Sequence, residues 1–331
     1  MDEPKQPTIE TPEKTLPVME SAAAAEPIPN WLFSKTGLRP LWCIAVFYGL
    51  FWLFAVGLGQ VLFRLVPAHA SRLWGYLAGE LGVLIAALLS ALVMTALDGR
   101  NFSEYGMPPR QAFGRMFWIG GLWGLASISV MLLAMRGAHL FDFGHIALHG
   151  ARILKFALFW AGFFLLVGLY EEFYFRGYFL FTLTRVLRSF SEDEESLDRS
   201  DASNATSFWI AAVMLCSYFG FVHLANTGES RVGIVAAAGI GLFFCLTLRR
   251  TGSLWFAVGF HTVWDWAQSF LYSVPDSGTL VPGHLLSSSL HGPPWLTGGS
   301  VGPEGSALVF VVIAATAVVF DRVYRVGAPG I

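Results

Sequence analysis

The chain has 331 residues, of which 55% are hydrophobic, 15% are aromatic and only 13% are charged. Soluble domains carry about 25% charged residues, so this chain has too few charges to cover a water-facing surface. Its mean hydropathy of +0.57 agrees with a largely lipid environment. The net charge of −2 lacks the basic excess that nucleic-acid-binding proteins need, and we expect no nucleic-acid partner.

The first 30 residues differ from the rest of the chain. Residues 1–30 are rich in Pro, Glu, Ala and Thr and contain no apolar stretch. This composition predicts a disordered tail and does not resemble a cleaved signal peptide. The three cysteines, Cys43, Cys216 and Cys245, all lie in apolar runs further along, which favours packed thiols over disulfides or a metal cluster.

Apolar runs dominate the remaining sequence, and most approach the roughly 20 residues that a helix needs to span a bilayer. In chain order they cover residues 41–66, 73–97, 117–135, 153–187, 207–225, 232–248, 254–272 and 307–324. They do not alternate between apolar and polar residues, as the strands of a membrane barrel do. The sequence therefore predicts an all-α, polytopic transmembrane helix bundle of about eight spans.

The connections suggest how the chain is divided. After the tail, residues 31–150 are expected to form N-terminal transmembrane helices, and residues 151–325 a second unit that contains most of the buried polar residues. Within this unit, residues 191–207 form an acidic, Ser-rich loop that we expect to be disordered. Residues 274–306 are rich in Gly, Pro and Ser and predict a long connection before the last span.

Basic residues orient the bundle. If the N-terminus lies inside, twelve Lys and Arg residues fall in or next to inside connections, against six on the outside. Because basic residues concentrate on the cytoplasmic side of membrane proteins, we expect both termini in the cytoplasm.

Charged residues interrupt the fourth apolar run. Charged side chains inside a span cost roughly 2.5–3.5 kcal/mol on insertion scales, so they mark functional candidates. Glu172 and Arg176 are four residues apart on one helix face and can form an ion pair, which predicts a structural role. Glu171 points about 100° away from this pair, so it is left as an isolated carboxyl in an apolar setting. We therefore expect Glu171 to act as a general base.

Two later spans contain histidines. His223 lies late in the fifth run, where a lone histidine can equally be a packed core residue. In the seventh run His261 and Asp265 are four residues apart, either as a simple helical hydrogen-bonded pair or as groups that act on a substrate carbonyl. If a bundle brings these residues to the carboxyl of Glu171, they suit the activation of a water molecule, directly or through a metal ion. The HExxH motif of zinc proteases is absent.

In order and spacing, these motifs resemble the CPBP family of intramembrane proteases, which contains the CAAX prenyl endopeptidases and the bacteriocin-processing and self-immunity proteins. The first motif is Glu-Glu-x-x-x-Arg, here Glu171, Glu172 and Arg176. The second is Phe-x-x-x-His, here Phe219 and His223. The third is His-x-x-x-Asn/Asp, here His261 and Asp265. The resemblance covers roughly residues 150–325, and the stretch at residues 302–305 also looks similar to the family.

The resemblance implies roles for these residues. Glu171 would activate the attacking water with help from His223, whereas His261 and Asp265 would stabilise the developing oxyanion or its surroundings. An ionised Asp cannot donate a hydrogen bond, so Asp265 would be protonated or would orient His261. Glu172, Arg176 and Phe219 would be structural or orienting residues.

The residue types are compatible with a metal-dependent mechanism and with a metal-free one. Glu171, His223 and His261 are residue types that bind Zn²⁺, and a metal-free glutamate mechanism is the competing interpretation.

We therefore expect an endopeptidase of the CAAX-protease type, an integral, multi-pass protein of a bacterial cytoplasmic membrane. It would contact membrane lipid and hydrolyse a membrane-associated peptide or protein. Two alternatives remain: a proton-coupled membrane transporter, since buried Glu, His and Asp also form proton relays, and a catalytically inactive immunity or scaffold protein.

Overall fold

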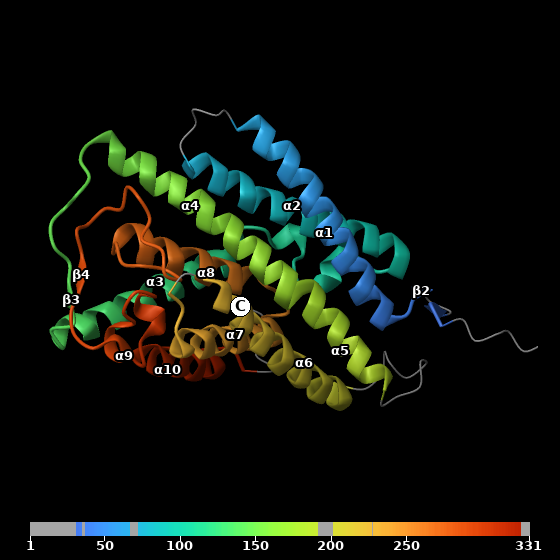
Figure 1. Ribbon diagram of the computed structural model, residues 1–331. Helices are drawn as coiled ribbons and strands as arrows, with labels where there is room; N and C mark the ends of the chain where they lie inside the picture. The colour runs from blue at the N-terminus through green and yellow to red at the C-terminus, as the bar shows by residue number, and fades with distance from the viewer. Residues whose placement is uncertain (1–30, 35–36, 67–71, 191–200, 227, 326–331) are drawn as a thin grey trace, which may run out of the picture.

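The protein is a helical bundle in its computed structural model (Figure 1). The structure describes residues 31–34, 37–66, 72–190, 201–226 and 228–325. The tail predicted at residues 1–30 and the first ten residues of the predicted acidic loop lie outside these ranges. The predicted all-α class is confirmed, because a bilayer offers no hydrogen bonds and a helix satisfies its backbone groups internally.

Six helices in the described part of the chain are long and apolar enough to span a membrane. They correspond to the first six predicted spans. They are α1 (Pro40–Leu65), α2 (Arg72–Asp98), α3 (Arg115–Gly137), the continuous rod of α4 (Ala151–Glu171), η3 (Glu172–Phe179) and α5 (Leu180–Ser189), α6 (Asp201–Val222) and α7 (Arg231–Thr251). Large apolar side chains cover their outer faces; Phe63, for example, is 81% exposed and suits contact with lipid.

The last two predicted spans form shorter helices. One is α8 (Trp255–Trp266), which continues as η5 (Ala267–Leu271), and the other is α10 (Leu308–Val323). Nine of the twelve residues of α8 are buried, because α3, α4 and α7 all pack against it. Helix α8 therefore occupies the interior of the bundle, and a polar residue on it faces other protein groups.

Glycines allow α3 and α8 to touch along their backbones. A Cβ at Gly120 or Gly124 of α3 would overlap the carbonyl oxygen of Phe256 or Phe260, and one at Gly259 of α8 would overlap that of Phe117. Small residues give this close packing in membranes, where van der Waals contact replaces the hydrophobic effect as the driving force. The contact fixes α8 relative to the rest of the bundle.

Helices α1 and α2 pack on the long rod through aromatic side chains. The rings of Phe47 and Tyr178 stack with centroids 3.7 Å apart, and the Tyr178 hydroxyl donates to the Cys43 carbonyl at 3.2 Å. At one end of the rod, the guanidinium of Arg185 is bidentate to Asp98, with a shorter distance of 2.5 Å. The N-terminal helices are thereby attached to the second unit.

Two segments are π-helical, with a wider turn than an α-helix. The segment η3 coincides with the charged motif in the fourth run, and η5 follows the motif in the seventh. π-Helical turns are rare and occur often at functional sites. The rod is continuous, and its irregular backbone lies where charged residues must be accommodated.

The connection before α10 folds over one end of the bundle. Its strand β4 (Ser289–Leu290) pairs antiparallel with β3 (Phe141–Asp142), and it contains α9 (Pro294–Thr297) and the 3-10 turn η6 (Pro303–Gly305). The other short elements are β1 (Phe33–Ser34) paired with β2 (Gly37–Leu38), and the 3-10 turns η1 (Phe102–Tyr105), η2 (Pro109–Gln111) and η4 (His223–Ala225). Helix α6 begins at Asp201, six residues before the predicted span.

Candidate active site

The centre of the site is a buried ion pair within η3. Arg176 donates to Glu172 Oε1 at 3.1 Å, and their side chains are only 2% and 0% exposed. The guanidinium also lies 4.0 Å from the ring centroid of Phe219 on α6, in a cation–π contact. A Cβ at Gly241 of α7 would come within 2.5 Å of Arg176 Nη2, so this glycine makes room for the guanidinium. The pair therefore connects the rod to α6 and α7.

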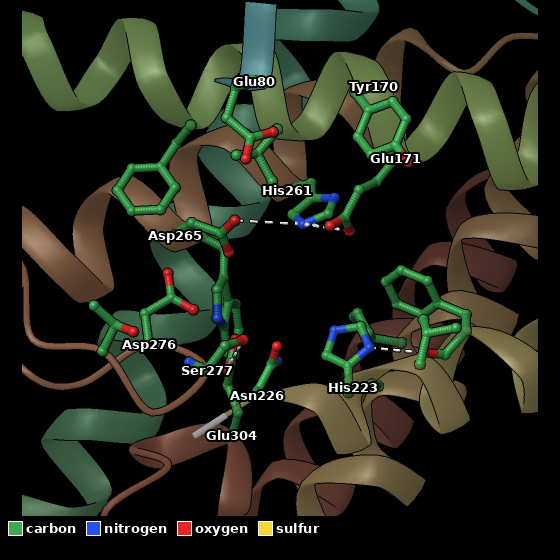
Figure 2. A pocket seen from close by; sticks show the side chains of 18 of the residues that line it. Glu80, Tyr170, Glu171, His223, Asn226, His261, Asp265, Asp276, Ser277 and Glu304 are labelled. Carbon is green, nitrogen blue, oxygen red and sulfur yellow. Dashed lines mark hydrogen bonds and ion pairs between the residues drawn. The ribbon is translucent and has the colours of Figure 1, made fainter. Parts of the chain in front are cut away.

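His261 connects α8 to the same pair. Its Nδ1 lies 2.9 Å from Glu172 Oε1, so Glu172 contacts both Arg176 and His261. The other ring nitrogen, Nε2, is 3.3 Å from Asp265 Oδ2 and 3.8 Å from Glu171 Oε2 (Figure 2). The spacing alone predicted the contacts within each helix, and the structure adds the contact between helices.

The surroundings of His261 indicate its charge. Both ring nitrogens face carboxyl oxygens, and a neutral imidazole can donate from only one of them. An imidazolium can donate from both, and its charge offsets part of the negative charge of Glu171, Glu172 and Asp265. Asp265 thus lies where it can orient His261, one of the two roles considered for it.

Glu171 and Glu172 are neighbours with different environments. The Glu172 side chain is fully buried, whereas that of Glu171 is 24% exposed and faces a cavity. The Glu171 carboxyl has no Arg or Lys partner among the described residues. It is therefore available to a water molecule or a substrate that enters the cavity.

His223 lies across the cavity from Glu171 (Figure 2). It begins η4, directly after α6, and its Nδ1 is 2.7 Å from the Phe219 carbonyl oxygen. Its ring packs edge-on against Phe219, with centroids 4.5 Å apart. Although His223 ends one span and His261 lies in the middle of another, both line one cavity.

The cavity has a volume of about 1090 Å³ and is lined by residues of α1, α2, the rod, α6, α7, α8, α10 and the connections before α7 and α10. Its polar lining includes Glu80 of α2, Asn226, Glu229 and Asp276, which the sequence motifs did not indicate, and Glu304, which lies in the stretch that looks similar to the family. Glu80 could have been found, since it is a lone carboxyl inside the second apolar run. Asp276 lies in the connection before α10, where a charged residue by itself carries no signal.

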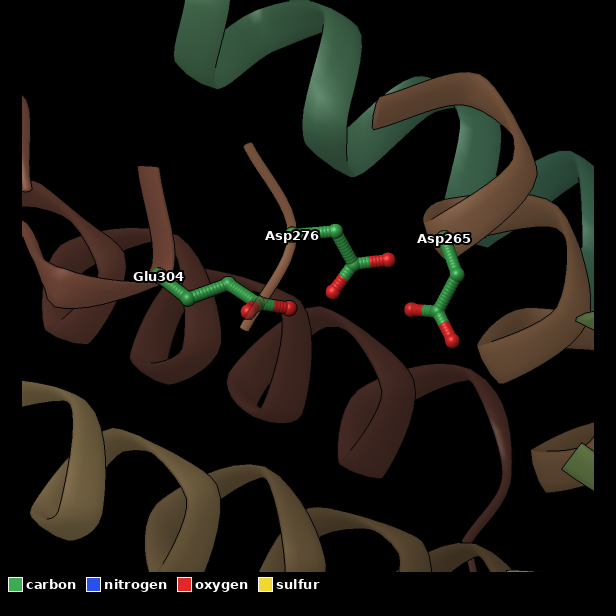
Figure 3. Close-up of side chains that lie close together, drawn as sticks. All are labelled: Asp265, Asp276 and Glu304. Atoms are coloured by element: carbon green, nitrogen blue, oxygen red, sulfur yellow. The ribbon is translucent and has the colours of Figure 1, made fainter. Parts of the chain in front are cut away.

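The predicted zinc ligands are not gathered as a metal site. The donor atoms of Glu171, His223 and His261 do not form a group within 4.8 Å of one another. The one such group in the described part of the chain is Asp265, Asp276 and Glu304 (Figure 3). Carboxylates alone are not a typical Zn²⁺ set, which uses Cys and His. The residues present do not fit the expected zinc centre.

The geometry is that of a cavity inside a helical bundle, with carboxyl groups and two histidines in its lining and a buried ion pair behind His261. Residues 153–267 match the model of the Rce1-like family of type II CAAX prenyl endopeptidases. No curated protein and no solved structure matches the chain.

Over these residues the chain matches a family of CAAX-type proteases, and the resemblance seen in the motifs is confirmed there. All seven predicted site residues fall within the matched segment, whereas Glu80, Asp276 and Glu304 lie outside it.

Proposed function

We propose that the protein hydrolyses a peptide bond of a membrane-associated peptide or protein in this cavity, with Glu171 as the general base. The observation that carries the proposal is the position of Glu171: its carboxyl faces the cavity, has no Lys or Arg partner among the described residues, and lies opposite His223. The family match supports the protease over the transporter and the inactive scaffold.

Proton transfers follow from the placement of each group. Glu171 accepts a proton from a water molecule held between it and His223, and the water oxygen attacks the peptide carbonyl carbon. The charge that develops on the carbonyl oxygen is stabilised by donation from Nε2–H of His261, whose Nδ1–H is fixed by Glu172. As the C–N bond breaks, Glu171 returns the proton to the leaving amine.

The buried residues prepare His261 for this role. Glu172 and Asp265 keep its ring charged and oriented, while Arg176 neutralises Glu172. Preorganised donors of this kind stabilise a transition state without reorganisation during the reaction. In this proposal Glu172, Arg176 and Phe219 are positioning residues that do not touch the substrate.

Cleavage by the purified protein in detergent tests the proposal. The substrates are quenched fluorescent peptides with an apolar segment next to the reporter bond, and the variants are Glu171→Gln and His223→Ala. We expect at least a 10²-fold loss of turnover in each. The matched control is Glu104→Gln, which removes a carboxyl from η1, outside the cavity. Unchanged turnover in both site variants contradicts the assigned roles.

Chelation distinguishes the two mechanisms considered from the sequence. We expect turnover to survive treatment with a strong chelator, because the metal-ligand set is not gathered around Glu171. Loss of turnover that Zn²⁺ restores contradicts the metal-free mechanism.

A further inference from the structure

The lining of the cavity is chemically uneven. One wall, formed by α1, α2 and the rod, is aromatic and includes Trp52, Tyr76, Trp160, Phe164 and Tyr174. The described lining also contains six carboxylic side chains and two histidines but no Lys or Arg. The carboxyls are those of Glu80, Glu171, Glu229, Asp265, Asp276 and Glu304. A substrate therefore meets an apolar surface and an excess of negative charge in one cavity.

Three of these carboxyls form an acidic wall, which we define as Asp265, Asp276 and Glu304. An oxygen from each lies within 4.8 Å of the others, although they come from α8 and two separate turns (Figure 3). No Lys or Arg in the described part of the chain forms an ion pair with any of them. Like charges at this spacing repel, so protonation of one of the carboxyls or the binding of a cation would stabilise the wall.

The backbone holds these carboxyls in place. Glu304 Oε2 accepts from the backbone N–H of Ser277 at 3.2 Å, and Asp276 Oδ2 accepts from Ser269 Oγ at 3.0 Å. The two turns are in backbone contact, since a Cβ at Gly302 would overlap the Pro275 carbonyl oxygen. These hydrogen bonds therefore fix the positions of the carboxyls, and each of them involves only one oxygen of its carboxyl group.

Asp265 gives an independent indication that the acidic wall can bind a ligand. It is only 6% exposed, and Oδ2 is close to His261 Nε2. Its other oxygen, Oδ1, has no hydrogen-bond or ion-pair partner among the described residues, and the carboxyl faces Asp276 (Figure 3). Because Asp265 lines the cavity, this oxygen can accept a hydrogen bond from a cation that enters it.

We propose that the acidic wall binds a basic side chain, Arg or Lys, of the peptide substrate, next to the bond that Glu171 and His223 act on. The aromatic wall takes the apolar part of the same substrate. The inference rests on the proposed endopeptidase function and specifies its substrate class: an apolar segment with a basic residue close to the cleaved bond.

The openness of the cavity argues against a divalent cation as the occupant of the acidic wall. A divalent cation of the Mg²⁺ or Ca²⁺ type needs about six or more oxygen ligands in a closed shell, whereas these carboxyls line a cavity of about 1090 Å³. Guanidinium and ammonium groups bring several donors of their own and suit an open wall.

The pKa values of Glu304 and Asp276 are raised by burial and by the neighbouring carboxyls of the wall. Burial, followed by the charge of Asp276, raises the pKa of Glu304 to about 8. Burial, followed by the charge of Asp265, raises the pKa of Asp276 well above its usual value. A bound cation would oppose both effects, so binding is coupled to the release of protons.

Peptide binding to the Glu171→Gln protein in detergent tests the inference without cleavage. The probes are fluorescent, amidated peptides of one apolar sequence, each with Arg at a different position, paired with the same peptide carrying Gln. We expect the Arg peptide to bind at least tenfold more tightly than the matching Gln peptide when the residue is at one or two adjacent positions. Fluorescence anisotropy measures the affinities. When Asp276→Asn and Glu304→Gln are combined, the ratio of the Arg-peptide affinity to the Gln-peptide affinity should fall towards one. Each single substitution should lower this ratio partway.

Asp142→Asn is the matched control, because it removes a carboxyl from the same end of the bundle but outside the cavity. It should keep the full preference for Arg. Equal binding of the Arg and Gln peptides at every position overturns the inference, as does a stoichiometric divalent metal that the double substitution releases. Absence of cleavage by the unaltered protein, with the preference intact, overturns the endopeptidase function but not the cation site.

Discussion

Glu171 and Glu172 differ in what surrounds them, although the sequence repeats the same residue. Glu172 is fully buried between Arg176 and His261, while Glu171 reaches the cavity. Helical spacing correctly predicted that Glu172, and not Glu171, pairs with Arg176. It could not show that Glu172 also holds His261, since that contact joins residues 89 positions apart.

This difference predicts opposite effects on stability. Glu172→Gln removes the charge that neutralises Arg176 and His261 and should lower the free energy of unfolding by about 3 kcal/mol, since breaking a buried ion pair strands its partner. Glu171→Gln should change the free energy of unfolding by less than about 0.5 kcal/mol, because Glu171 is partly exposed and His261, its partner at 3.8 Å, keeps Glu172 and Asp265. Unfolding of both variants in the same detergent compares them directly. Equal losses of unfolding free energy would contradict a structural role for Glu172 that Glu171 does not share.

The acidic wall predicts a pH dependence of substrate preference. Because the pKa of Glu304 is raised to about 8, its carboxyl is mostly protonated at pH 6.5 and ionised at pH 9. Arg stays charged throughout, so its binding advantage over Gln should grow across this range. Asp265, Asp276, Glu229 and His261 face the same carboxyl, and loss of a proton from any of them adds negative charge in the same direction.

Peptide binding to Glu171→Gln at each pH measures this advantage. When Glu304→Gln is added to the Glu171→Gln protein, the increase in the binding advantage of Arg over Gln between pH 6.5 and pH 9 should be clearly smaller. A preference for Arg that is constant from pH 6.5 to pH 9 contradicts the binding of the basic residue at the acidic wall.

At the scale of elements, the position of α8 sets the site geometry. Its apolar run predicted a span, and the structure has a short buried helix that continues as the π-helix η5. The sequence shows why it can be central: the glycines of α3 and α8 permit backbone contact. It does not reveal which helices pair, because every apolar run is equally suited to lipid or protein.

The close contact between α3 and α8 predicts that a single added methyl group destabilises the protein. Gly259→Ala places a Cβ against the Phe117 carbonyl oxygen and should destabilise the protein by about 1–3 kcal/mol, the usual cost of overpacking. Turnover should fall as well, because α8 carries His261. Gly162→Ala on α4 is the control, since no atom lies within 4 Å of its added Cβ. Equal thermal stability of the two variants would contradict the role of this contact.

At the scale of the whole molecule, composition and run length were enough to predict the class and the eight helical segments. The composition of the cavity was harder to predict. Glu80 comes from α2, and Asp276 and Glu304 come from the connection before α10, so the site combines segments from both predicted units. Local patterns identify a charged residue inside a span, but they cannot identify one in a connection that folds back over the bundle.

The orientation in the membrane is a remaining prediction from the basic residues. Both termini are expected in the cytoplasm, which places the connection before α10 on the outside and the segment between α2 and α3 inside. Single cysteines at Ser289 and Ser103, both exposed, report on these two sides. The three natural cysteines are buried and should react slowly with a membrane-impermeant maleimide.

In intact cells we expect Ser289→Cys to be labelled and Ser103→Cys to be protected until the membrane is opened. The reverse pattern would place the acidic wall on the cytoplasmic side, where basic segments flanking membrane spans are most abundant. The labelling result therefore also decides from which side a peptide with a basic residue would enter the cavity.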